Sequence, residues 1–284
     1  MELTFLGTAA SEGYPDAFCG CPNCETARVL GGKSLRKRSA ALIDREVLLD
    51  LGPDVMAASL QHGVPLTDVR ACLLTHEHDD HLDASHLHSR SPHCGVIDAP
   101  CLEFYATQGA IDRAAGRFGR WLPPNGLAHS ETSARLNLRV CPIEPGQSFA
   151  VGPYRVLSVP ATHGTDLLPL LFAIERDGRA LFYATDTGPL SDMAWRSLRG
   201  WHHPFNVVAL DHTMGMSERS TGHLNAEQFI EQLDRLRAEN LLAGDCRVFA
   251  HHLGHHSNPD HETLTAFAAA RGYRVAFDGL TVSV

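Results

Sequence analysis

The segment LLTHEHDDHLD, residues 73–83, decides how the sequence is interpreted. It continues the apolar run VRACLLT (69–75), which is typical of a buried strand. His76, His78, Asp80 and His81 then follow within six positions. Imidazole and carboxylate together suit zinc, manganese or iron, and a strand anchors the loop that carries them. Four donors this close in sequence serve two ions more easily than one, so the segment predicts a two-metal site.

The rest of the chain predicts one layered α/β domain that spans residues 1–284. Hydrophobic residues make up 44% and charged residues 20%, which is ordinary for a globular protein. No Ser/Gly-rich linker and no tight repeat divide the sequence. The patterns predict strands at 2–7, 69–75, 153–160, 170–176, 179–185, 205–211, 247–252, 274–279 and 280–284, a hairpin at 39–50, helices at 52–63, 99–118, 225–240 and 258–272, and a loop at 121–133. Two sheets inside and helices outside would accommodate this order.

Composition bears on partners and compartment. The formal charge is −9, which argues against long nucleic acid as the main partner. The basic run 33–38 is a solvated loop in the simplest interpretation and a phosphate-contacting rim in the alternative. The start of the chain lacks the pattern of a signal peptide, and no apolar run approaches the roughly 20 residues that span a membrane. We therefore expect a cytoplasmic protein with reduced thiols and no membrane partner.

Three cysteines are crowded together in CGCPNC, residues 19–24, whereas the other five are scattered. In a reducing compartment, Cys19, Cys21 and Cys24 favour a metal site over a disulfide. Tetrahedral zinc needs a fourth ligand, which this segment does not supply. Three unliganded thiols in a loop are the alternative.

The HxHxDH motif resembles the signature of the metallo-β-lactamase superfamily, and four further segments resemble it in the same order. These are LLDLGPD (48–54), PATHG (160–164), YATDTG (183–188) and VFAHHLGHH (248–256). The resemblance implies a four-layer αββα sandwich with metals at one edge of the two sheets. It assigns a first ion to His76, His78 and His163. It assigns a second ion to Asp80, His81 and a late histidine, with Asp186 between the two ions.

This pattern also implies a chemistry. A hydroxide that bridges two divalent ions would attack the substrate, and a centre with about one net positive charge would suit a monoanionic phosphodiester. The resemblance makes Asp80 and His223 the catalytic residues, with His223 as the general acid for the leaving group. The alternative is that His223 is an exposed residue at the start of the following helix. Asp211 ends a strand near the site, where we expect it to orient a ligand histidine.

The N-terminal segment 7–24 resembles one branch of the superfamily, the phosphoribosyl 1,2-cyclic phosphate phosphodiesterases. There, CxCxxC binds a structural zinc whose fourth ligand is a histidine three residues after the last catalytic one. The candidates are His251, His252, His255 and His256. Alignment on the following NPDHE segment favours His252 as catalytic and His255 as structural, but the spacing by itself leaves the choice open.

The expected function is hydrolysis of a small cyclic phosphate ester. It would use two divalent ions, zinc or manganese, and one structural zinc, and relatives in this branch suggest a homodimer. One alternative is hydrolysis of another ester class by a nuclease, thioesterase or lactonase. Another is a non-catalytic carrier or cofactor-biosynthesis protein, but the HxHxDH motif is often degraded in that family and is intact here. The segment 83–150 is longer than the corresponding segment in compact members of the superfamily. His86, His88 and His93 in this segment are expected to be extra surface groups or part of a lid.

Overall fold

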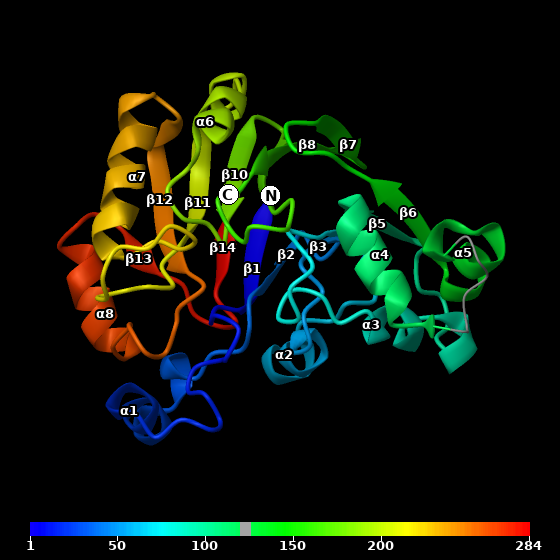
Figure 1. The fold of residues 1–284 in the computed structure, drawn as a ribbon, viewed down its shortest axis with the longest axis horizontal. Helices are drawn as coiled ribbons and strands as arrows, with labels where there is room; N and C mark the ends of the chain where they lie inside the picture. Colours follow the sequence, from blue (N-terminus) through cyan, green and yellow to red (C-terminus); the bar gives the residue numbers. More distant parts are fainter. Residues whose placement is uncertain (120–125) are drawn as a thin grey trace.

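The computed structural model describes residues 1–119 and 126–284, and two seven-stranded mixed sheets lie within these ranges (Figure 1). The first sheet has the order β14-β1-β2-β3-β4-β5-β6. Its strands are β14 (Thr281–Ser283), β1 (Glu2–Gly7), β2 (Ala40–Ile43), β3 (Val47–Leu49), β4 (Ala71–Leu73), β5 (Leu102–Ala106) and β6 (Leu138–Pro142). The predicted hairpin at 39–50 is the pair β2–β3.

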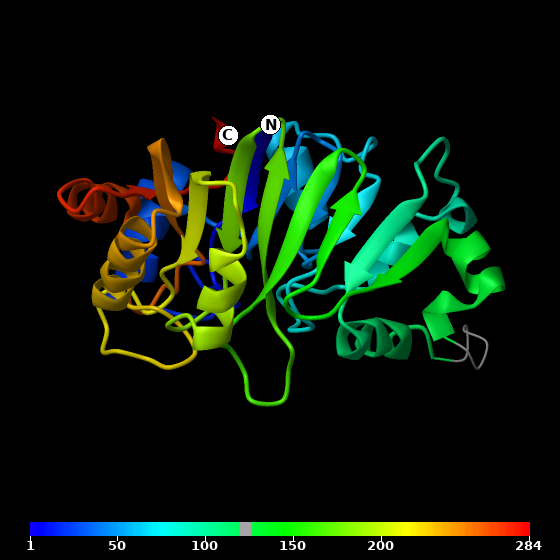
Figure 2. The ribbon, with the colours of Figure 1, turned by 90° about the horizontal axis from the view of Figure 1, so that it is seen from above.

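The second sheet contains most of the later strands and has the order β13-β12-β11-β10-β9-β8-β7. Its strands are β13 (Arg274–Val275), β12 (Leu242–His251), β11 (Phe205–Asp211), β10 (Arg179–Ala184), β9 (Leu170–Arg176), β8 (Tyr154–Pro160) and β7 (Ser148–Val151). Figure 2 shows the β8–β9 connection as a long loop that projects beyond the strands.

The helices cover the outer faces of the two sheets. On the second sheet lie α6 (Asp192–Arg199), α7 (Ala226–Ala238) and α8 (His261–Ala269); on the first lie α2 (Val55–His62), α3 (Ser85–Ser89), α4 (Gln108–Gly116) and α5 (Ser130–Leu136). Alternation along the strands separates these layers. In β10, Leu181 and Tyr183 face the other sheet whereas Phe182 faces the helices, and in β2, Ile43 and Leu42 divide in the same way. The arrangement is the predicted four-layer αββα sandwich in a single domain.

Strand direction gathers one set of strand ends at one edge. Strands β3 and β4 are parallel, as are β10, β11 and β12. Strand β8 is antiparallel to β9, and β9 is antiparallel to β10, so β8 runs in the direction of β10. The carboxyl ends of these strands precede every predicted ligand of the catalytic pair.

Some local predictions are wrong. The predicted helix 99–118 is a strand, β5, followed by α4, because LEFYA pairs between β4 and β6 and is mostly buried. In the predicted loop 121–133, residues 121–125 lie outside the described residues, 126–128 form a 3₁₀ turn and α5 begins at Ser130. Helices α1 (Pro22–Leu30), α3 and α6 and strands β6 and β7 were not predicted. In the described ranges, no helix has the length and apolar character to cross a membrane.

Candidate metal centre

The first group of ligand-type residues consists of His76, His78 and His163. His76 and His78 follow β4, and His163 follows β8. His78 Nδ1 lies 2.8 Å from His76 Nε2 and 3.0 Å from His163 Nε2. Three ring nitrogens therefore converge from two loops. Around a zinc ion with bonds of about 2.0 Å, tetrahedral ligands would lie about 3.3 Å apart, close to this spacing.

The second group is buried and combines Asp80, His81, Asp186 and His252. Asp186 Oδ2 contacts His81 Nε2 and lies 3.0 Å from His252 Nε2. Asp80 Oδ2 lies 3.1 Å from His81 Nε2 and 3.5 Å from His252 Nε2. Asp186 Oδ2 is also 3.7 Å from His76 Nε2, so this carboxylate lies between the two groups, as the sequence resemblance implied.

Hydrogen bonds behind the loop set the tautomers of two histidines. Asp50 Oδ2 lies 2.7 Å from His81 Nδ1, and Asp50 Oδ1 accepts from the Thr75 hydroxyl at 2.8 Å. The Thr75 oxygen lies 3.0 Å from His76 Nδ1. Each Nδ1 thus faces an acceptor and donates a proton to it, which directs both Nε2 atoms at the site. This is how outer partners orient ligand histidines.

A similar arrangement exists on the other side of the site. His163 Nδ1 lies 3.1 Å from the Gly222 carbonyl. His252 Nδ1 lies 2.8 Å from Thr213 Oγ1, which donates to Asp211 Oδ2 at 2.9 Å. The expectation that Asp211 helps to orient a ligand histidine therefore agrees with the geometry, although it acts through a threonine.

The histidines of the two ligand groups differ in the direction of their pKa shifts. Burial lowers the pKa of His76 well below its ordinary value and also lowers the pKa of His163, which keeps both rings neutral. Burial would lower the pKa of His81 and His252 too, but neighbouring carboxylates outweigh it. The pKa of His252 rises to about 10, with Asp186 as the main charge responsible. The pocket thus attracts positive charge, which divalent ions would supply in place of protons.

Three site residues adopt the left-handed backbone conformation, which is uncommon outside glycine. Asp50, Asp186 and His252 have φ of 66°, 50° and 55°. Each comes one or two residues after a strand, where this conformation turns the chain toward the sheet edge. Gly52 is needed for a different reason, because a Cβ atom there would collide with the Asp80 carbonyl oxygen.

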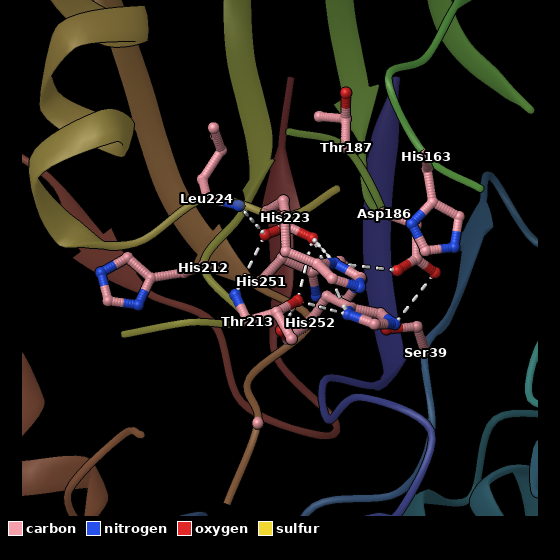
Figure 3. Close-up of polar contacts among 12 residues, drawn as sticks. Ser39, His163, Asp186, Thr187, His212, Thr213, His223, Leu224, His251 and His252 are labelled. Atoms are coloured by element: carbon pink, nitrogen blue, oxygen red, sulfur yellow. Dashed lines mark hydrogen bonds and ion pairs between the residues drawn. The ribbon is translucent and has the colours of Figure 1, made fainter. Parts of the chain in front are cut away.

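His223 lies at the edge of the same site (Figure 3). Its Nδ1 is 3.1 Å from Asp211 Oδ2 and 3.4 Å from Asp186 Oδ1. Its ring stacks on His252 with 5.9 Å between centroids. Burial would lower the pKa of His223, but the charge of Asp211 and its hydrogen bond raise it. A capping box of Asn225 and Gln228 begins α7 just after His223 and so fixes this segment.

The three clustered cysteines meet a histidine from the far end of the chain. Cys19, Cys21, Cys24 and His255 form a third group of possible ligands, all within 4.8 Å of one another. His255 Nδ1 is 3.3 Å from Cys24 Sγ and 3.7 Å from Cys21 Sγ. Tetrahedral zinc would separate sulfur and nitrogen ligands by about 3.5 Å. Burial would raise the pKa of Cys21, but hydrogen bonds from Cys24 and His255 lower it to about 6.

The structure places the four late histidines, among which the sequence spacing allowed no choice, in different surroundings. His252 joins Asp186, and His255 joins the cysteines. His251 is buried between the sheets, where its Nε2 lies 3.1 Å from the Tyr183 hydroxyl. His256 is exposed. The placement agrees with the alignment-based choice of His252 for the catalytic pair and His255 for the cysteine group.

The residues present fit divalent ions. In the described residues, His81 Nε2 and His252 Nε2 are buried and make no hydrogen bond of good geometry, although both lie beside the Asp80 and Asp186 carboxylates. Such buried polar atoms are expensive unless something satisfies them. The sequence analysis did not identify Thr75, Thr213 and the Gly222 carbonyl as groups that orient the candidate ligand histidines. For the two threonines, a signal was their place next to His76 and two residues after Asp211.

Comparison with known proteins agrees with this architecture. The profile of the beta-lactamase superfamily domain matches residues 45–269. Coenzyme PQQ synthesis protein B of Azoarcus sp. (strain BH72) is 26% identical, and the alignment covers 100% of both chains. The crystal structure of a new diphosphatase from the PhnP family superposes with a TM-score of 0.73 at 20% identity, covering 100% of this chain and 97% of the other. Zinc-bound PqqB from Methylobacterium extorquens superposes with a TM-score of 0.72 at 20% identity, covering 100% of both chains.

The two solved structures support the fold alone at this level of identity. The matched profile covers most of the chain, including the HxHxDH loop, His163, Asp186 and His252. This chain therefore belongs to the beta-lactamase superfamily, as a metal-dependent hydrolase with the metallo-β-lactamase fold.

Proposed function

We propose that this protein is a phosphodiesterase that acts on a small cyclic phosphate ester of the phosphoribosyl cyclic phosphate type. The observation that carries the proposal is the junction of two ligand groups at Asp186, with His223 beside them. The first ion would be held by His76, His78 and His163, and the second by Asp80, His81 and His252. Asp186 would contact both.

Divalent ions in these positions would polarise a phosphoryl oxygen, lower the pKa of a water molecule and stabilise both the entering and the leaving oxygen. The protein's own residues then have distinct tasks. Asp50 and Thr213 hold the ring nitrogens of His81 and His252 in place. The rigid loop after β4 keeps four donors oriented before substrate arrives, which reduces the reorganisation that the reaction requires.

His223 is the group that would protonate the leaving oxygen. Asp211 binds its Nδ1, so the ring is held in one orientation, and no hydrogen bond to a described residue engages its Nε2. This leaves Nε2 to donate a proton to a departing alkoxide. Asp80 would contribute to catalysis as a ligand that positions the second ion.

The test is turnover by protein loaded with zinc or manganese. We expect hydrolysis of bis-(p-nitrophenyl) phosphate and ribose 1,2-cyclic phosphate to exceed that of a β-lactam and a thioester by a wide margin. Asp186→Asn should abolish turnover while leaving the far-UV circular dichroism unchanged. Faster hydrolysis of the thioester would assign the protein to another ester class.

Metal content is the second part of the proposal. Two ions at the histidine–aspartate centre and one zinc at the Cys19 group give about three per chain, the count that the two separate donor sets imply. Elemental analysis of protein purified without chelators measures it. One ion or fewer, with zinc and manganese supplied, would contradict the proposed pair. The same sample would show by sedimentation whether the protein is a homodimer.

A cofactor-biosynthesis role is the second candidate, because the similarity to coenzyme PQQ synthesis protein B extends over the whole chain. Under that alternative, the protein would bind metal but would not hydrolyse the phosphodiester panel. The donor set weighs against it, since every position of the HxHxDH motif is filled and contributes to one of the two groups.

A further inference from the structure

Asn258 lies just after the two late histidines, and its side chain is fully buried. Its Nδ2 is 3.0 Å from the Gly254 carbonyl oxygen, 3.1 Å from that of His212 and 3.2 Å from that of Thr213. Gly254 belongs to the loop after β12, whereas His212 and Thr213 belong to the loop after β11. One amide group therefore holds three main-chain carbonyls from two loops.

The orientation of the Asn258 amide follows from its neighbours. Carbonyl oxygens accept hydrogen bonds only, so the nitrogen of the amide, which is a donor, has to face them. The other end of the amide, Oδ1, lies 2.8 Å from His212 Nδ1 and accepts from it. His212 Nε2 then accepts from the Tyr273 hydroxyl at 3.2 Å. Both ends of the amide are thus engaged, which fixes the side chain in one position.

Thr213 connects this amide to the metal centre (Figure 3). Its carbonyl accepts from Asn258 and also from the Ser257 hydroxyl at 2.6 Å. Its own hydroxyl oxygen is 2.8 Å from His252 Nδ1. Because two side chains hold the Thr213 carbonyl, the hydroxyl of the same residue keeps its place beside the His252 ring.

The two loops have no spare room between them. A Cβ atom on Gly254 would lie 2.7 Å from the Thr213 carbonyl oxygen, and one on Gly215 would lie 2.6 Å from Asn258 Oδ1. The segment that carries the cysteines reaches the same place, since the buried Tyr14 hydroxyl donates to the Asn258 carbonyl at 2.9 Å. Asn258 therefore joins three segments that are distant in the sequence.

We propose that Asn258 is a positioning residue for the second metal ion. By holding Thr213, its amide would keep the His252 ring in the orientation in which Nε2 faces the carboxylates of Asp80 and Asp186. Outer hydrogen bonds of this kind raise the affinity of a metal site without touching the ion. The inference rests on the proposed function for the presence of that ion, and it adds a side chain on which the affinity for the ion depends.

The first ion should not depend on Asn258. The Thr75 hydroxyl and the Gly222 carbonyl orient His76 and His163. Within the described ranges, no hydrogen bond joins Asn258 to either of these two groups. Removing the amide should therefore weaken one ion of the pair and spare the other, which a general loss of stability would not do.

The test measures zinc affinity of Asn258→Ala by chelator competition, without substrate. The second ion should bind about tenfold more weakly than in the wild type, whereas the first ion and the cysteine-bound zinc should keep their affinities. Repeating the titration in a His78→Ala background, in which the first ion is weakened, assigns the loss to the second ion. Cobalt in place of zinc reports the cysteine group separately, because only thiolate-bound cobalt has a strong charge-transfer absorption.

Asn206→Ala is the matched control. Asn206 is 5% exposed and lies in β11, at the end away from the metal centre. Its amide accepts from the Ala180 main-chain nitrogen at 3.0 Å and donates to Asp245 at 2.9 Å. Both variants should melt at a lower temperature, but only Asn258→Ala should lose affinity for the second ion. Equal losses of affinity in the two variants, or no loss in either, would overturn the inference.

A double variant tests the route through Thr213. Thr213→Val keeps the branched shape and removes the hydroxyl, so it should weaken the second ion by itself. If Asn258 acts through Thr213, Asn258→Ala/Thr213→Val should bind this ion no more weakly than Thr213→Val, whereas additive losses would contradict the route. Asn258→Ser, which keeps one donor, should show a smaller loss and replaces Asn258→Ala if that variant does not fold. Protein that binds its ions as expected but hydrolyses no phosphodiester would refute the proposed reaction and leave this inference standing.

Discussion

Acid should weaken this protein at one buried contact that involves no candidate metal ligand. Arg36 is only 5% exposed, and its Nη2 donates to His261 Nδ1 at 2.9 Å. Its Nη1 donates to the Thr8 hydroxyl at 2.8 Å. His261 begins α8 and is 8% exposed. The imidazole has to stay neutral, because a proton on Nδ1 would face the guanidinium. Burial, with the charges of Arg36 and Lys33, lowers the pKa of His261 to about 4.

The size and sign of the effect follow from this pKa. An unfolded chain binds the proton near its ordinary value of about 6.5, whereas the folded chain resists it until about pH 4. The unfolded state therefore binds more protons between these values, and the free energy of unfolding falls as the pH falls. A difference of this size corresponds to about 3 kcal/mol in full, most of it lost by about pH 4.5.

The assay is urea unfolding at pH 7.5 and 4.5, followed by circular dichroism, on wild type and His261→Asn. Asparagine keeps an acceptor for Arg36 but does not titrate, and its lost packing on Phe277 is the same at both pH values. The wild type should lose about 2 to 3 kcal/mol more than the variant between the two pH values. His202→Asn, at an exposed position, controls for the substitution itself. Equal losses in wild type and His261→Asn would refute the reasoning.

The other predictions concern the metal groups. His252→Ala should abolish turnover and keep the cysteine-bound zinc, whereas His255→Ala and Cys21→Ser should both lose that zinc and melt at a lower temperature; zinc loss in His252→Ala would reverse the two assignments. Gly52→Ala should lower metal content and turnover together, since its Cβ would collide with the Asp80 carbonyl oxygen, and normal metal content would contradict this. His223→Ala should slow esters with poor leaving groups far more than nitrophenyl esters, and equal losses would make His223 a binding residue.

The candidate ligands of the metal centre could be selected from the sequence because they follow strand ends. Each donor comes shortly after an apolar strand, and parallel strands bring such ends to one edge. The choice between His252 and His255 could not be made from spacing, since any pair three residues apart fits. What separates them is backbone conformation, because His252 has a φ of 55° and turns inward. Sequence periodicity does not reveal a single left-handed residue.

The errors have a different origin. LEFYA, residues 102–106, fits the apolar spacing of a helix, but its place between β4 and β6 makes it a strand. Tertiary pairing overrides local pattern in such segments. The groups that orient the ligands were hidden for another reason. His163 depends on the carbonyl of Gly222, 59 residues away, and a main-chain atom leaves no mark in the sequence.

The cysteine group and the candidate metal centre are linked through the backbone of residues 252–255. His252 and His255 bracket Leu253, which is fastened to the N-terminal segment from both sides. Leu253 N donates to the Thr8 carbonyl at 2.9 Å, and Ala10 N donates to the Leu253 carbonyl at 3.1 Å. A zinc that ties His255 to Cys19, Cys21 and Cys24 would hold the same N-terminal segment in place. Losing that zinc would free the backbone that positions His252, so turnover should fall without any change to a catalytic ligand.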